Sequence, residues 1–146
     1  MFAKRAKGAK RPAVQLNRLS SLVAHDVEIV GDLHFSGGVR IDGHLRGHAI
    51  ARPAASESPT LLVLSDQGRI EGSVRCDDAL INGTVDGDLD VGHYLELQSN
   101  ARITGTVRYV HLKMDVGAAV QGAMVHAGGG AGTDNVVELP VEKTAG

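Results

Sequence analysis

Aromatic residues are scarce in this sequence: they make up 3% of its 146 residues, and tryptophan is absent. An apolar core must therefore be built from the aliphatic side chains that dominate the 42% hydrophobic fraction. The single cysteine, Cys76, excludes an intrachain disulfide, which fits a reducing compartment. No apolar run approaches the roughly 20 residues of a membrane-spanning helix, and no apolar signal region follows the basic N-terminus. We expect the chain to lie in the cytosol or on a membrane surface.

Helical periodicity is also missing. No stretch sustains the 3.6-residue spacing of apolar residues that marks an amphipathic helix. Glycine, in contrast, is frequent, with 19 residues spread along the chain. Short alternating or apolar stretches lie between the glycines, which is typical of strands of about three to five residues with one face inward. The sequence therefore predicts an all-β fold with frequent turns.

A five-residue unit, aliphatic–x–Gly–x–aliphatic, recurs through the middle of the chain. Six copies are Ile29–Leu33, Ile41–Leu45, Ile70–Val74, Ile81–Val85, Ile103–Val107 and Val120–Met124. The central glycine allows the chain to bend sharply because it tolerates positive φ, and the flanking aliphatic residues suit a core. Internal repetition of this density predicts a solenoid.

A longer period of about 17 residues relates these units and sets the length of one coil. Gly87 and Gly105 are 18 residues apart, whereas Gly43 and Gly83 lie 40 apart, which is two coils plus an insertion. The insertion is the polar segment Arg52–Pro59, since its prolines cannot donate to a strand ladder. The prediction is a parallel β-helix of about six coils with three short strands each. It covers residues 21–126, between a disordered basic arm (1–20) and a flexible tail (127–146) that contains the apolar stretch Val136–Val141.

The repeated units resemble the bactofilin domain. The likeness is clearest in Val39–Gly47, Ala79–Leu89 and Ala101–Tyr109, and it covers about residues 20–126. The opening Met1–Lys7 resembles the short membrane-targeting sequence of some family members. The resemblance implies a right-handed β-helix, filaments that form without nucleotide, and a scaffold for cell-shape or cell-wall machinery, with peptidoglycan synthases or hydrolases as candidate partners. We expect no enzymatic activity and no cofactor.

The two ends of such a solenoid bear on assembly. Terminal coils leave backbone N–H and C=O groups unpaired, and repeat proteins ordinarily close their ends with a polar cap. The sequence offers no capping helix, so we expect further copies of the chain to complete the ends by strand addition. The predicted interface residues are Leu22, Val23, Val27 and Ile29 in the first coil and Val116, Val120 and Met124 in the last. The alternative is that these residues pack inside an end-capped monomer.

The first 20 residues carry six basic side chains and no acid, on a body with eight basic and fourteen acidic residues at positions 21–126. We expect this arm to bind an anionic membrane. Phe2 would insert at the surface while Lys4, Arg5, Lys7, Lys10 and Arg11 face headgroups, each contributing on the order of 1 kcal/mol. Nucleic acid, held through its phosphates, is the competing partner, and Phe2 and the resemblance favour the membrane. The expected location is the inner face of the cytoplasmic membrane.

Two other kinds of chemistry fit the sequence less well. A β-helical acyltransferase of hexapeptide repeats would show a strict six-residue spacing, which this chain lacks. A metal site could draw on His93 and His111, which the period predicts to stack on neighbouring coils, but no further ligand completes it at a diagnostic spacing. Asp86, Asp88 and Asp90 alternate along the chain, which predicts one acidic strand face.

Overall fold

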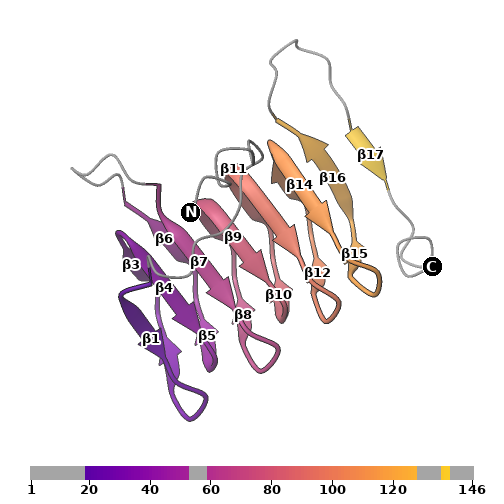
Figure 1. Ribbon diagram of the computed structural model, residues 1–146. Coiled ribbons are helices and arrows are strands. Elements are labelled where there is room, and N and C mark those ends of the chain that lie inside the picture. The colour runs from indigo at the N-terminus through magenta and orange to yellow at the C-terminus, as the bar shows by residue number, and fades with distance from the viewer. Residues whose placement is uncertain (1–18, 53–58, 128–135, 139–146) are drawn as a thin grey trace, which may run out of the picture.

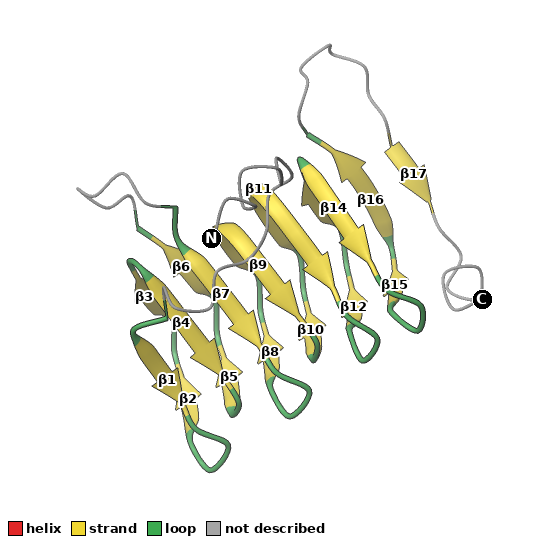
Figure 2. Ribbon diagram, in the orientation of Figure 1, coloured by secondary structure: helices red, strands yellow, loops and turns green. Residues whose placement is uncertain are grey.

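The protein is a β-solenoid. The computed structural model describes residues 19–52, 59–127 and 136–138, and within these ranges the chain forms strands and turns but no helix (Figure 2). About six coils stack into a rod that runs from β1 at one end to β16 at the other (Figure 1). Every coil passes through three faces, and strands of successive coils pair in parallel. The predicted all-β fold and number of coils are confirmed.

The three faces are numbered in the order in which each coil meets them. Face 1 holds β1 (Ser21–Val23), β4 (Gly38–Ile41), β7 (Leu61–Leu64), the C-terminal halves of β9 (Val74–Ile81) and β11 (Leu89–Leu97), and β14 (His111–Met114). Face 2 holds β2 (Glu28–Val30), β5 (His44–Arg46), β8 (Arg69–Glu71), β10 (Thr84–Asp86), β12 (Arg102–Thr104) and β15 (Ala119–Gln121). Face 3 holds β3 (Leu33–Phe35), β6 (Ala49–Ala51), the N-terminal halves of β9 and β11, β13 (Val107–Tyr109) and β16 (Ala123–His126).

Inward side chains form continuous ladders along the rod. The ladder on face 2 runs through Ile29, Leu45, Ile70, Val85, Ile103 and Val120. The ladder on face 3 runs through Leu33, Ala49, Val74, Leu89, Val107 and Met124. Each aliphatic side chain packs on its counterpart one coil away, at a strand spacing of about 4.8 Å. The core is therefore built by repetition, as the composition required.

The insertion lies where the sequence placed it. Strand β6 ends at Ala51 and β7 begins at Leu61, and residues 53–58 lie outside the described part of the chain. The register passes over the insertion, because Val39 pairs with Leu62 and Leu62 pairs with Ala79. Residues 40 apart, such as Val39 and Ala79, therefore lie two coils apart, as the glycine spacing predicted.

The five-residue units mark two different corners rather than one. Gly43 and Gly83 turn the chain from face 1 to face 2, whereas the other four units turn it from face 2 to face 3. At this second corner the glycines have positive φ and stack directly on one another. A Cβ added to Gly72, where φ is 155°, would lie 2.6 Å from the carbonyl carbon of Gly47 in the coil before it. Where such a glycine rests on the coil before it, no other residue type fits without moving the coils.

The third corner, from face 3 to face 1, lies within single strands in the middle coils. Strands β9 and β11 pass through it as continuous strands of 8 and 9 residues, longer than the sequence predicted. Their pairing shifts register between Val91 and Tyr94, which is typical of a β-bulge. A bulge bends the strand and interrupts the ladder only locally, and the pairing resumes at Tyr94 and Asp78.

The predicted acidic strand face is wrong. Gly87, with φ of 157°, separates Asp86 at the end of β10 from Asp88 and from Asp90 in β11. The three carboxylates thus lie on both sides of a corner. Asp88 accepts a hydrogen bond from the backbone N–H of Thr106 at 3.0 Å, which ties the corner to the next coil.

Candidate assembly interface at the solenoid ends

The outermost strands have unpaired edges. At the N-terminal end, β1, β2 and β3 pair only with β4, β5 and β6 among the described strands. At the C-terminal end, β14 and β15 are likewise the last members of their ladders in the described part of the chain. Strand β16 differs, because β17 (Val136–Glu138) pairs with it antiparallel (Figure 1). The N–H and C=O groups along an unpaired edge are available to a further strand.

Four inward side chains of the terminal coils are only partly buried. They are Ile29 and Leu33 in the first coil and Leu112 and Met114 in the last. The equivalent residues of the inner coils, such as Leu45 beside Ile29, are 0–2% exposed. Partial burial at these ladder positions shows that the apolar core is not fully covered at either end of the solenoid.

The structure separates the seven predicted interface residues into two groups. The four inward residues are Val23 (9% exposed), Ile29, Val120 (0%) and Met124 (1%). The three exposed residues are Leu22 (61%), Val27 (41%) and Val116 (80%). Leu22 alternates with the inward Val23 in β1 and so projects from the outer surface of face 1. Val27 and Val116 lie in turns between faces 1 and 2. Their part in a contact between copies stays a prediction.

Sequence analysis missed three of the partly buried residues, Leu33, Leu112 and Met114. A signal for Leu33 was present, since it closes the first five-residue unit, Ile29–Leu33. Leu112 and Met114 occupy the positions one coil after Leu95 and Leu97. The predicted 17-residue period places both at the last layer of face 1.

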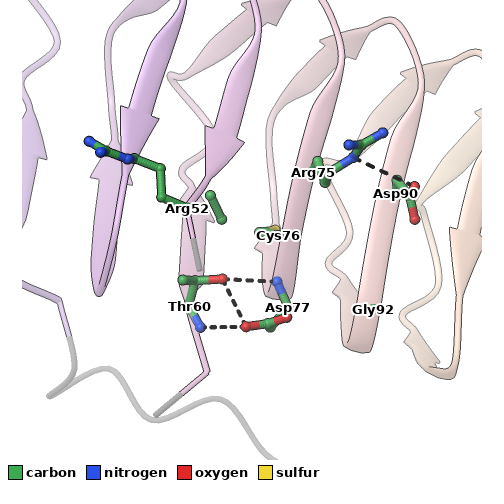
Figure 3. A pocket seen from close by; sticks show the side chains of 8 residues that line it. Arg52, Thr60, Arg75, Cys76, Asp77, Asp90 and Gly92 are labelled. Atoms are coloured by element: carbon green, nitrogen blue, oxygen red, sulfur yellow. Dashed lines mark hydrogen bonds and ion pairs between the residues drawn. The ribbon is translucent and has the colours of Figure 1, made fainter. Parts of the chain in front are cut away.

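One surface hollow of about 310 Å³ lies beside the insertion (Figure 3). It is lined by Ala51, Arg52, Thr60, Arg75, Cys76, Asp77, Asp90 and Gly92. The backbone N–H and hydroxyl of Thr60 donate to the Asp77 carboxylate at 3.0 and 3.2 Å, and the N–H of Asp77 donates to the Thr60 hydroxyl at 3.0 Å. Burial, helped by nearby carboxylates, raises the pKa of the Cys76 thiol far above its usual range. These groups fasten the base of the insertion to the next coil.

A model of the bactofilin family, described as polymer-forming cytoskeletal, matches residues 21–125. The chain belongs to the bactofilin family. The match begins with β1 and ends within β16, so it spans all the stacked coils. The comparisons with curated proteins and with solved structures gave no match. The family assignment therefore rests on the family-model match over the stacked coils.

In this bactofilin the outer surface of face 2 carries an ion-pair ladder. Arg46 lies 3.5 Å from Glu28 and 3.8 Å from Glu71, and Arg69 lies 3.5 Å from Glu71 and 2.6 Å from Asp86. Three of these pairs join strands of neighbouring coils, whereas Arg69–Glu71 lies within β8, and exposed pairs of this kind contribute about 0–1 kcal/mol each. The ladder favours correct register along the rod and accounts for much of the charge on this face.

The histidine prediction is confirmed in its geometry. The rings of His93 and His111 lie on neighbouring coils with centroids 5.6 Å apart, edge to face. His93 Nδ1 lies 2.8 Å from the carboxylate of Asp78. Within residues 19–52 and 59–127, no three histidine, cysteine or acidic side chains are grouped so as to hold a metal ion.

The predicted membrane residues cannot be placed. Phe2, Lys4, Arg5, Lys7, Lys10 and Arg11 all lie outside the described residues. In the part of the bactofilin that the structure describes, no helix is long and apolar enough to cross a bilayer.

Proposed function

We propose that this bactofilin polymerises end to end through its terminal coils, without nucleotide, into filaments or sheets that scaffold cell-shape or cell-wall machinery. The observation that supports this is the partial burial of Ile29, Leu33, Leu112 and Met114, at ladder positions that are closed in the inner coils. A second copy stacked on an end would cover these side chains and pair the strand edges. Each backbone hydrogen bond gained contributes about 0.5–1.5 kcal/mol net, in addition to the apolar burial.

The direct test is sedimentation of the purified full chain without nucleotide. Polymer should appear in the pellet and as filaments or sheets by electron microscopy, because an incomplete end needs only another copy of the chain. Addition of ATP, GTP or EDTA should leave the pelleted fraction unchanged. A chain that stays monomeric at all concentrations and salts would rule out the proposal.

We also propose that the basic arm holds the polymer at the inner face of the cytoplasmic membrane, where peptidoglycan synthases or hydrolases are its candidate clients. The support is the charge asymmetry of the sequence, with six basic residues and no acid among the first 20. One arm binds weakly, but arms linked in a polymer bind together, because linkage raises their effective concentration at the surface.

Deletion of residues 2–8 should weaken binding to vesicles that contain anionic lipid by about a hundredfold, since it removes three basic residues worth about 1 kcal/mol each and also Phe2. Vesicle co-sedimentation measures this, with zwitterionic vesicles as the matched control. Phe2→Ser, which keeps every charge, separates apolar insertion from attraction. Equal binding by the deletion variant, or binding of the intact arm to duplex DNA alone, would contradict the membrane role.

A further inference from the structure

The two ends of the solenoid are unequal because of β17. Its pairing with β16 joins Ala123 to Glu138, Met124 to Val137 and Val125 to Val136. This pairing is antiparallel, whereas all the other strand pairs among the described residues are parallel. Strand β17 therefore does not begin a further coil. It covers one of the three edges of the last coil (Figure 1).

We propose that β17 is a displaceable strand that occupies, within one chain, the edge that a second copy needs at the C-terminal end. This inference rests on the proposed end-to-end assembly. The outer edge of β16 can pair with one strand only, so an incoming copy and β17 exclude each other there. Growth at this end requires β17 to leave, whereas β1, β2 and β3 at the other end have no such strand among the described residues.

Burial at the two ends agrees with this asymmetry. On faces 2 and 3 the inward residues of the last coil, Val120 and Met124, are 0% and 1% exposed. Their counterparts in the first coil, Ile29 and Leu33, are only partly buried. The C-terminal end is thus closed at Met124, on the face that carries β17, and also at Val120 on face 2, and it stays incomplete at Leu112 and Met114 on face 1.

Displacement of β17 is feasible because β17 is short and an incoming copy offers more strands for pairing. Three residues of β17 hold one edge, whereas a whole terminal coil brings three strands and can also pair with β14 and β15. The segment 128–135 tethers β17 to β16, so its local concentration is high and it competes well at low protein concentration. The expected result is a switch that raises the concentration needed for polymerisation without preventing it.

The test uses proline variants of the full chain. Val136→Pro and Val137→Pro each disturb the strand, and because successive N–H groups point to opposite sides, one of the two removes a donor to β16. Lys143→Pro, in the same tail but outside β17, is the matched control. The critical concentration, measured by sedimentation, should fall about tenfold in at least one strand variant and stay unchanged in the control, a factor that corresponds to about 1.4 kcal/mol.

The outcomes separate this inference from the function on which it rests. Polymer in every chain at one critical concentration, or a higher value in the strand variants, overturns the role of β17 alone. Absence of polymer in every chain overturns end-to-end assembly, and the inference with it. A second measurement is hydrogen exchange of the Val136–Glu138 amides in the full chain. Protection should be present below the critical concentration and fall in the polymer, and protection that persists in the polymer contradicts displacement.

Discussion

Ile29→Asp should fold and yet fail to polymerise, with a critical concentration raised more than about a hundredfold. At the end of an unassembled solenoid the carboxylate can reach water, because Ile29 is only partly buried. Between two stacked copies it would be enclosed without a partner, and an uncompensated buried charge costs about 3–5 kcal/mol. Sedimentation gives the critical concentration, and circular dichroism with thermal melting shows that the fold is retained.

The matched control is Val30→Asp, one residue further along β2. Val30 is 75% exposed and alternates to the outer side of face 2, so its charge should leave assembly unchanged. Filaments of normal length from Ile29→Asp, or equal loss of assembly from both variants, would refute the N-terminal end as an interface. The size of the blocked species also reports polarity. A contact between like ends leaves dimers joined at the C-terminal coil, whereas a contact between unlike ends leaves monomers.

The period of the fold could be predicted because every coil must satisfy the same two packing requirements. An aliphatic residue must meet its counterpart one coil away, and a tight corner must be free of side chains. These demands leave a trace such as Ile103–Val107 in every coil. The insertion was equally visible, since a Pro-bracketed polar stretch cannot lie within a ladder. Spacing alone therefore gave the number of coils and their approximate bounds.

The two kinds of corner could not be distinguished by the same pattern. Gly43 and Gly105 have identical flanking patterns, but only Gly105 has positive φ and stacks on another such glycine. What decides between them is the coil on which each one rests, and that contact is not local in sequence. The same reason explains why Asp86 and Asp90 were wrongly assigned to one strand.

The end layers of the solenoid were predicted in position but only partly in their residues. Residues were chosen for apolar character near each end, which brought in Leu22 and Val116. Leu22 projects sideways and Val116 lies in a turn, whereas the end layer is set by the ladder. Leu33 and Met114 belong to that layer because of register, and register follows from pairing between coils. Strand β17 was missed, although it begins the apolar stretch Val136–Val141, because three residues are too few to give a periodic signal.

In the proposed assembly, folding and polymerisation would use the same kind of contact between coils. An inner coil contacts only its two neighbours, so stability grows by nearest-neighbour terms. Each contact in the ladder from Leu45 to Ile103 needs only a matching coil beside it, and a coil of a second chain could supply the same contact. In the proposed polymer a terminal coil would therefore gain from another copy what an inner coil gains from its own chain, and a change that separates inner coils should damage both folding and assembly.

Gly72→Ala should show most strongly how far stability depends on the contact between inner coils. At φ of 155° an alanine is strained by about 1–3 kcal/mol, and its Cβ would also overlap the Gly47 carbonyl group in the coil before it. The coils must part at this point, so we expect a total loss above about 4 kcal/mol, in the range that only severe core defects reach. Thermal melting followed by circular dichroism should show Tm lower by about 15 °C, given roughly 4 °C per kcal/mol for a domain of this size.

Gly31→Ala is the control that isolates the overlap. Gly31 also has positive φ, 129°, but it lies in the first coil and an added Cβ would have no atom within 4 Å. Its substitution should cost only the backbone strain of about 1–3 kcal/mol, and less where the terminal coil relaxes. Similar melting temperatures for the two variants would mean that close stacking of glycines does not hold the coils together. A clear gap between them would assign the difference to contact between coils, the same kind of contact that end-to-end assembly would repeat.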